Sequence, residues 1–306
     1  MQKLYGLHLS YHYFIDPGEK KPGVLCEKET FRKQCVCLKE NNFQVLPFSE
    51  IVGRLNNNRP LPEHLASLSF DDGLRDGYEF AFPILKEFGF VGSFSIITCT
   101  LEGQIPPVIA FQILIGELGA EKIEFEIFPE LLKGTAYATL LNHEQYDIRD
   151  AKKPEPPEMR RVKWIFNHFL PTSLQLDIIK EMFETYLGPG SENMLHKRYF
   201  IQPDEIREMA NYGMDFCSHT VNHPDFTKIG TSEIEQELIN SKAQLLEISR
   251  QDVTVFIWPF GATYSGKLKK VVAKYYSGAW NFGIQRGSPE DIMDLRRIDQ
   301  ADFQIY

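Results

Sequence analysis

Cysteine is scarce in this 306-residue chain, and no two cysteines form a C-x-x-C pair. The chain has five: Cys26, Cys35, Cys37, Cys99 and Cys217. An odd number without paired spacing argues against a disulfide framework and against a thiolate metal site.

Long apolar runs are also lacking, because no stretch approaches the roughly 18–20 residues of a membrane span. The best contender, Val108 to Leu118, is broken by Gln112, Gly116 and Glu117. The first eight residues have one lysine followed by polar alternation, which is not the pattern of a signal peptide. We therefore expect a cytoplasmic protein without a membrane span.

Positive charge is in deficit, with 33 Lys+Arg against 42 Asp+Glu and a net charge of −9. The chain has no Lys/Arg-rich block, so a nucleic-acid-binding surface is not expected. Hydrophobic residues make up 43% of the chain and aromatic residues 13%, enough for a sizeable core. The length fits two domains or one α/β barrel.

Strand and helix patterns alternate through the first hundred residues. Leu65 to Phe70 is apolar at nearly every position, as a strand buried on both faces should be. Further strands are predicted at 4–13, 44–46 and 91–97, and helices at 28–41 and at 76–88, the latter ending at Gly89. This alternation predicts an α/β fold with a parallel sheet or barrel.

The same alternation returns near residue 200. A helix is predicted to begin at Pro203, and Ser232 with Glu235 indicates a capping box for a helix ending at Ile248. The other expected elements are strands at 214–217, 253–258, 278–281 and 294–298 and a helix at 265–275.

The stretch between these two parts lacks the alternation of strands and helices. It contains Pro106-Pro107 and a charged, proline-containing linker at 147–158. Helical patterns occupy 162–169 and 172–187. We predict a barrel formed by 1–100 and 200–306 and a largely helical insertion at 101–199. The insertion is a candidate lid over the barrel mouth; a peripheral subdomain or an oligomer contact is the alternative.

Two adjacent carboxylates and a glycine, Asp71-Asp72-Gly73, close the apolar strand at 65–70. Asp and Gly are common in ordinary turns that end strands, and that explanation suffices for the residues taken alone. In α/β barrels, however, catalytic groups lie at the carboxyl ends of the strands. There the two side chains could diverge, one to a metal and one to a water.

Two imidazoles, His219 and His223, lie four residues apart directly after the strand predicted at 214–217. Such a pair can converge on one cation, and neutral imidazole with carboxylate suits zinc and similar divalent metals. A surface histidine pair is the alternative. Pro224 favours a loop over a helix here.

Two later segments are less distinctive. Trp258-Pro259-Phe260-Gly261 follows an apolar strand and can be read as its turn. Leu295-Arg296-Arg297-Ile298 places two arginines at a short strand, where a solvated charge pair is equally plausible.

Taken in order, these four motifs resemble the polysaccharide deacetylase family, also known as the chitooligosaccharide deacetylase homology domain. Ser10-Tyr11-His12 is similar to the family branch whose first strand ends in Tyr-His. The resemblance covers about 1–98 and 199–298. It implies a distorted (β/α) barrel with a divalent metal, usually zinc.

The resemblance also implies residue roles. Asp72, His219 and His223 match the metal triad, Asp71 matches the general base, and the backbone N–H of Phe260 matches an oxyanion donor. The implied reaction is hydrolysis of the N-acetyl group of an acetamido sugar by a metal-activated water. A soluble or lipid-linked saccharide precursor is the expected substrate, and the oligomeric state stays open.

The chain departs from the family at two points. Ile257 stands where an arginine often steadies the base, and we expect Arg297 to substitute. The usual C-terminal histidine acid is missing, because no histidine follows His223.

The position of His12 at the end of the first strand makes it the candidate acid. Of the other histidines, His8 is expected in the core, and His64, His143, His168 and His196 lie in loops or the insertion. A loop histidine capping the strand is the alternative for His12.

Two other functions stay open at this point. One is hydrolysis of another C–N bond, such as a formamide or a cyclic imide, on the same scaffold. The other is a catalytically silent carbohydrate-binding protein, which the missing acid favours and the retention of Asp71 with three metal-ligand candidates opposes.

Overall fold

The computed structural model describes residues 6–19, 21, 23, 25–142, 156–261, 264–284 and 291–303. The chain divides into two compact units. The first comprises Met1–Glu19, Val24–Gln104 and His196–Tyr306, and the second comprises Lys20–Gly23 and Ile105–Leu195.

Seven parallel strands of the first unit close into a barrel, as predicted. They follow one another around the ring until β5 pairs back with β1. In ring order they are β1 (Leu7–Tyr11), β10 (Leu295–Asp299), β9 (Gly278–Phe282), β8 (Val255–Ile257), β7 (Asp215–Ser218), β6 (Ser93–Ile96) and β5 (Leu65–Phe70). Because all seven are parallel, the segments that follow them emerge at one rim.

Three short strands lie outside the ring. β4 (Gln44–Val45) pairs with the beginning of β5, while β6 pairs with its end. β2 (Tyr13–Ile15) and β3 (Leu25–Glu27) form a separate parallel pair. The single strand predicted at 4–13 is thus two strands within the described residues, with His12 between them.

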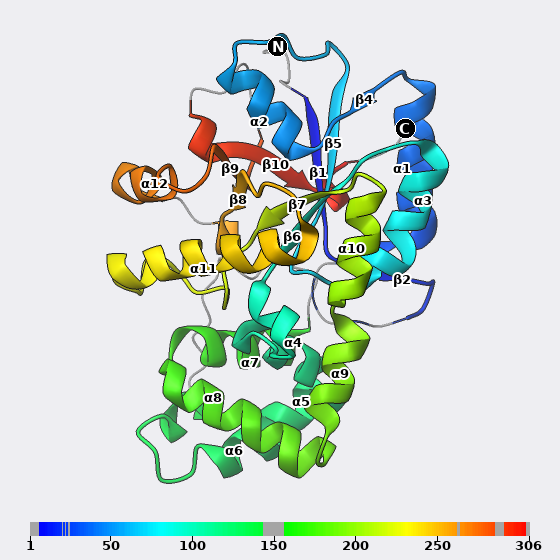
Figure 1. The fold of residues 1–306 in the computed structure, drawn as a ribbon. Helices are drawn as coiled ribbons and strands as arrows, with labels where there is room; N and C mark the ends of the chain where they lie inside the picture. The colour runs from blue at the N-terminus through cyan, green and yellow to red at the C-terminus, as the bar shows by residue number, and fades with distance from the viewer. Residues whose placement is uncertain are drawn as a thin grey trace. The chain divides into compact units, whose positions relative to one another are not determined.

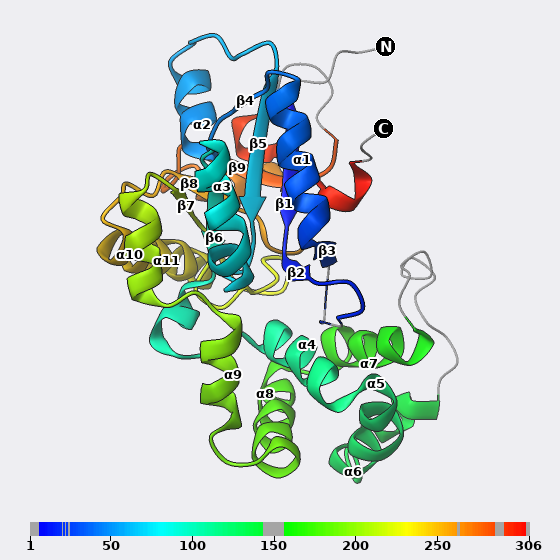
Figure 2. The same ribbon diagram turned by 90° about the vertical axis from the view of Figure 1, so that its right-hand side faces the viewer.

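Helices surround this barrel (Figure 1). They are α1 (Lys28–Glu40), α2 (Phe48–Asn56), α3 (Phe82–Phe88) after the π-helical turn Gly77–Ala81, α10 (Pro203–Asn211), α11 (Thr231–Ser249) and α12 (Gly266–Val272). α1 buries Phe31, Cys35 and Leu38, the apolar positions that predicted it, and packs beside α3 (Figure 2). α3 ends at Gly89, whose φ of 68° suits glycine.

The predicted capping box of α11 is wrong. The helix begins at Thr231 with Gly230 as its N-cap, so Ser232 lies inside the first turn. Glu235 Oε1 instead accepts a hydrogen bond from Lys274 Nζ at 2.7 Å. An S-x-x-E pattern caps a helix only when its serine is the N-cap, the residue directly before the first helical one.

Buried apolar side chains fill the barrel and the layer beneath its helices. All six residues of β5 are buried, as the apolar run predicted. Trp280 stacks on Phe48 with ring centroids 4.0 Å apart. His8 contacts the edge of Trp280 and is 3% exposed, so it is a core histidine as expected.

The second unit is helical in its described residues. Its elements are α4 (Pro107–Leu118), α5 (Ala120–Lys122), the π-helical turn Ile123–Ile127, α6 (Phe128–Leu131), the 3₁₀ turn Ala138–Asn142, α7 (Pro157–His168), α8 (Thr172–Glu181) and the π-helical turn Met182–Leu187. α9 (Ser191–Tyr199) begins in this unit and continues into the first. Phe111 stacks on Phe166 with ring centroids 3.8 Å apart.

Two features of the predicted insertion are not tested. Most of the charged linker at 147–158, and His143, lie outside the described residues. The role of the insertion as a lid stays a prediction.

Among the described residues, no helix combines the length and apolar character that a membrane crossing requires.

Candidate metal centre and its carboxylate partner

A left-handed turn at the end of β5 sends its two carboxylates in different directions. Asp72 and Gly73 have φ of 65° and 68°. Asp71 turns toward Arg297, and Asp72 turns toward His219. The divergence expected from the Asp71-Asp72-Gly73 sequence is therefore present.

The two histidines lie on a loop after β7, as Pro224 indicated. Thr220 and His223 both have left-handed backbones, with φ of 69° and 56°. The Thr220 side chain stabilises this shape, because its Oγ1 accepts a hydrogen bond from the His223 N–H at 2.8 Å. The loop thereby folds both rings back toward the end of β5.

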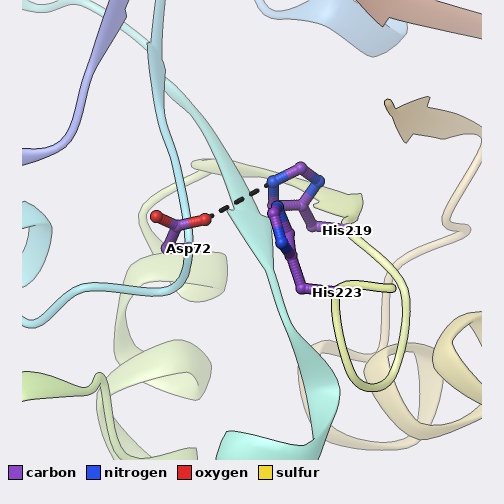
Figure 3. A group of neighbouring side chains, drawn as sticks. All are labelled: Asp72, His219 and His223. Atoms are coloured by element: carbon purple, nitrogen blue, oxygen red, sulfur yellow. Dashed lines mark ion pairs between the residues drawn. The ribbon is translucent and has the colours of Figure 1, made fainter. Parts of the chain in front are cut away.

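Asp72, His219 and His223 meet in one buried cluster (Figure 3). One possible ligand atom from each lies within 4.8 Å of the other two. His219 Nε2 is 3.4 Å from Asp72 Oδ1, and the two imidazole centroids are 4.6 Å apart. Two imidazoles and a carboxylate at this separation can hold a divalent metal.

The protonation pattern of the histidines also fits a metal. His219 Nδ1 lies 3.0 Å from the Ile257 carbonyl oxygen. Since a carbonyl only accepts, Nδ1 carries the proton and the Nε2 lone pair faces Asp72. Nδ1 of His223 is buried and has no hydrogen-bond partner among the described residues.

Burial controls the charge of the cluster. Burial, helped by His219, lowers the pKa of His223 to about 3, so its imidazole is neutral at pH 7. Burial alone would raise the pKa of Asp72, but His219, with His12 and His223, lowers it below its ordinary value. A neutral His223 imidazole beside an ionised Asp72 carboxylate is in the protonation state that binds a metal.

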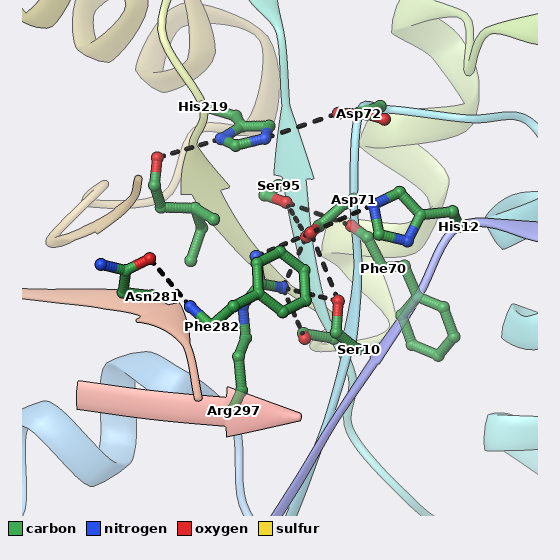
Figure 4. Close-up of polar contacts among 12 residues, drawn as sticks. Ser10, His12, Phe70, Asp71, Asp72, Ser95, His219, Asn281, Phe282 and Arg297 are labelled. Carbon is green, nitrogen blue, oxygen red and sulfur yellow. Dashed lines mark hydrogen bonds and ion pairs between the residues drawn. The ribbon is translucent and has the colours of Figure 1, made fainter. Parts of the chain in front are cut away.

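Asp71 is the centre of a second network (Figure 4). Ser95 Oγ donates to Asp71 Oδ1 at 2.6 Å, and Ser10 Oγ donates to Oδ2 at 3.3 Å. Arg297 Nη1 and Nη2 donate to Oδ1 and Oδ2 at 2.7 and 2.6 Å. Burial would raise the pKa of Asp71, but Arg297, with His12 and His219, holds it well below its ordinary value.

Arg297 reaches Asp71 from β10, which is separated from β5 by one strand, β1. It is 1% exposed, and Nη1 also donates to Ser10 Oγ and Ser69 Oγ. Its guanidinium lies over the Phe282 ring, 4.7 Å from the centroid. Ile257, where the family often has arginine, is a buried strand residue, and the arginine that contacts Asp71 is Arg297.

His12 lies beside Asp71, with Nε2 3.7 Å from Oδ2. Its side chain is 17% exposed and stacks on Phe282, with ring centroids 6.3 Å apart. The other described histidines are differently placed. His196 is buried against the Thr100 carbonyl, and His64 and His168 are exposed.

Phe260 lies in the 3₁₀ turn Pro259–Gly261 after β8. Its φ is 60°, and its ring lies 4.6 Å from that of His223 although 52% of the residue is exposed. A bulky residue in a left-handed backbone is strained, and such strain concentrates at functional sites.

The sequence did not identify the serines that surround Asp71. Ser10, Ser69 and Ser95 are inward-facing hydroxyls on three strands that are otherwise largely apolar. Ser10 pairs directly with Ser69 across β1 and β5. Serines near the carboxyl ends of largely apolar strands are the signal that could have found them.

The fold and the site define this chain as a parallel β/α-barrel protein with a buried Asp-His-His cluster that can bind a metal. Residues 178–277 match the family model described as polysaccharide deacetylase. The predicted resemblance to the polysaccharide deacetylase family is therefore confirmed. The matched range contains both histidines but neither Asp71 nor Asp72.

Similar structures cover nearly the whole chain. The Streptococcus pyogenes deacetylase PplD in complex with acetate is 18% identical with a TM-score of 0.60, over 98% of this chain and 93% of that chain. A de-N-acetylase from Aggregatibacter actinomycetemcomitans is 16% identical with a TM-score of 0.57, over 96% and 94%. At these identities the likeness establishes the fold.

Sequence relatives match a shorter part. The poly-beta-1,6-N-acetyl-D-glucosamine N-deacetylase of Escherichia coli strain K12 is 31% identical over 80 residues. Its counterpart in Escherichia coli O157:H7 gives the same values. The match spans 26% of this chain and 12% of the length of these relatives.

Proposed function

We propose that this protein is a metal-dependent hydrolase that removes the N-acetyl group from an acetamido sugar. The observation that carries the proposal is the placement of Asp71, held by Arg297, next to the buried cluster of Asp72, His219 and His223. A metal-binding cluster beside a separately held carboxylate suits hydrolysis by water.

Asp72, His219 and His223 would hold the metal, and zinc is the ion their ligand set favours. When bound, such a metal polarises an acyl oxygen and makes water more acidic. The neutral imidazole of His223 and the Nδ1–H of His219 on the Ile257 carbonyl keep nitrogen lone pairs available for it.

Asp71 would accept the proton of the attacking water as general base. Four hydrogen bonds to its carboxylate fix the orientation of its oxygens. They also keep the carboxylate ionised, because each of them stabilises the charged form. Arg297 therefore orients the base but also weakens it.

Phe260 and His12 would complete the site. The Phe260 N–H would stabilise negative charge on the acyl oxygen, and the left-handed turn fixes the direction of this N–H. His12 would donate a proton to the leaving amine, since Nε2 lies near the base and the side chain is partly exposed.

The substrate class follows from the relatives. Proteins similar to this chain are named as a deacetylase in complex with acetate, as polysaccharide deacetylases and as an N-deacetylase of an N-acetylglucosamine polymer. An N-acetylated sugar or saccharide is thus the first substrate to test.

The test is acetate release from a panel of N-acetylated mono- and oligosaccharides, with and without added zinc. The same panel includes a formamide and a cyclic imide. Zinc-dependent acetate release from a saccharide is the expected result. Turnover of only the formamide or imide would indicate a different C–N hydrolase, and saccharide binding without turnover would indicate a silent binding protein.

A further inference from the structure

A buried carboxylate on α11 contacts the loop that joins the two metal-site histidines. Glu237 is 9% exposed. Its Oε2 accepts hydrogen bonds from the backbone N–H groups of Val221 and Asn222 at 2.7 and 3.0 Å. Its Oε1 accepts from Asn222 Nδ2 at 2.7 Å. One side chain thus binds both residues directly after Thr220 in the turn to His223.

The other side of the same loop is fixed by backbone. The N–H groups of Thr98 and Cys99 donate to the carbonyl oxygens of Thr220 and Val221, both at 3.0 Å. The loop is therefore held between the 3₁₀ turn Thr98–Glu102 that follows β6 and the Glu237 carboxylate. Neither contact involves a metal ligand directly.

The backbone of the loop requires such support. Thr220 is β-branched and has a φ of 69°, and His223 has a φ of 56°. A non-glycine residue in this region is strained and persists only when its surroundings enforce it. Without support, the loop would relax toward ordinary angles, and the two imidazoles would separate.

Glu237 is also poorly explained as a packing residue. It has no ion-pair partner among the residues that the structure describes, so three N–H donors alone compensate its charge. Burying an unpaired carboxylate is costly unless hydrogen bonds satisfy it. An apolar residue of similar size would stabilise α11 at lower cost, but it would release the loop.

We infer that Glu237 is a positioning residue that sets the metal affinity of the Asp72, His219 and His223 cluster. The inference rests on the metal site of the proposed function. A carboxylate suits the task because both its oxygens only accept. Glutamine would present an NH₂ group to at least one of the three donors.

The dissociation constant of Zn²⁺, measured by competition with a chromophoric chelator, tests this inference. Glu237→Gln is expected to weaken Zn²⁺ binding about 10- to 100-fold, the usual effect of losing a group that orients metal ligands. Glu235→Gln is the matched control on the same helix, since Glu235 pairs with Lys274, away from the loop. Its Zn²⁺ affinity should equal that of the unmodified protein.

Asn222→Ala provides a milder variant, because Asn222 is exposed and its side chain contributes one of the three hydrogen bonds, while its backbone N–H keeps another. We expect a smaller loss of Zn²⁺ affinity, and this variant decides the question if Glu237→Gln does not fold. An unchanged Zn²⁺ affinity in folded Glu237→Gln, or in Asn222→Ala when the former is unfolded, overturns the inference.

Melting temperatures distinguish positioning from plain stability. If Glu237 positions the metal ligands, the rise in melting temperature on adding Zn²⁺ should be smaller in Glu237→Gln. The reason is that bound Zn²⁺ stabilises the folded protein less when its affinity is lower. A purely structural role predicts a lower melting temperature with the same rise, and that result also overturns the inference. Absence of Zn²⁺ binding in the unmodified protein would instead refute the metal site itself.

Discussion

Arg297 and Asp71 form a bidentate ion pair in the interior of the barrel, with Nη2 2.6 Å from Oδ2 and both side chains fully enclosed. The residues come from β10 and from the turn after β5, which lie on either side of β1 in the ring. This pair joins the last strand of the barrel to the proposed catalytic base.

The first prediction is that Arg297→Met destabilises the protein by about 3–5 kcal/mol, because it leaves a buried carboxylate without its partner. Arg54→Lys, at the partly exposed pair with Glu50, should cost less than about 1 kcal/mol. Urea unfolding of both variants measures the difference. Equal and small losses would contradict the assigned importance of the buried pair.

The first prediction extends to turnover, because Arg297→Lys at the same ion pair is expected to change its pH dependence. Arg297 lowers the pKa of Asp71, so losing the bidentate contact raises that pKa. The base is then protonated at a higher pH, and the acid limb of the kcat/KM profile moves to higher pH. An unshifted acid limb would mean that Asp71 does not act as the base.

Elements with one strong local pattern could be predicted from the sequence. β5 was found because the Leu65–Phe70 run is mostly apolar, and the histidine loop because it follows a strand and contains Pro224. α2 was missed although its buried residues Phe48, Ile51 and Val52 have helical spacing, because Phe48–Asn56 is short. A helix of nine residues offers few turns over which such spacing can be recognised.

The supporting contacts of the site could not be predicted, because they depend on how distant elements meet. Ser95 and Asp71 lie 24 residues apart and touch only because β5 and β6 are neighbours. Glu237 is one acid among several on α11, and only the fold places it against Asn222. Arg297 was a candidate only because Ile257 stands where the family often has an arginine. That argument did not show from the sequence that Arg297 lies next to Asp71.

The second prediction concerns the metal cluster. His219→Ala and His223→Ala should each lower the bound metal well below one ion per chain, since each removes one of three candidate ligands. His64→Ala is the control, because His64 is exposed and lies outside the cluster. Elemental analysis of the purified variants measures the stoichiometry, and unchanged stoichiometry in both cluster variants would refute the assignment.

The third prediction separates the two aspartates. Asp71→Asn should retain the metal and lose turnover by about 10²–10⁴-fold, the range expected for a general base. Asp72→Asn should lose metal affinity. If metal is lost from Asp71→Asn and kept by Asp72→Asn, the two roles have been exchanged.

The fourth prediction concerns His12. A general acid must be protonated, so turnover falls as the pH rises above its pKa, and this produces an alkaline limb. His12→Gln should retain metal, lower kcat about 10²–10⁴-fold and remove that limb. A pH–rate profile of His64→Gln serves as the control. Full activity in His12→Gln would exclude His12 as the acid.

The last prediction is a pH dependence of stability that arises away from the metal cluster. Burial lowers the pKa of His8 to about 3, whereas an unfolded histidine titrates near 6.5. Below pH 6.5 the unfolded chain therefore takes up a proton that the folded chain excludes. The contribution of His8 is complete above pH 6.5 and is lost as the pH falls toward 3. At pH 5 the loss is on the order of 2 kcal/mol.

Urea unfolding at pH 7.5 and pH 5, at the same metal content, measures this contribution. His8→Gln removes the titrating group while keeping a polar side chain beside Ser67, to which His8 Nδ1 is hydrogen-bonded at 2.8 Å. The free energy of unfolding of the unmodified protein should fall by about 2 kcal/mol more than that of His8→Gln. His64→Gln should behave like the unmodified protein, because its side chain is exposed. Identical pH dependence in all three would show that His8 accepts its proton without unfolding the barrel.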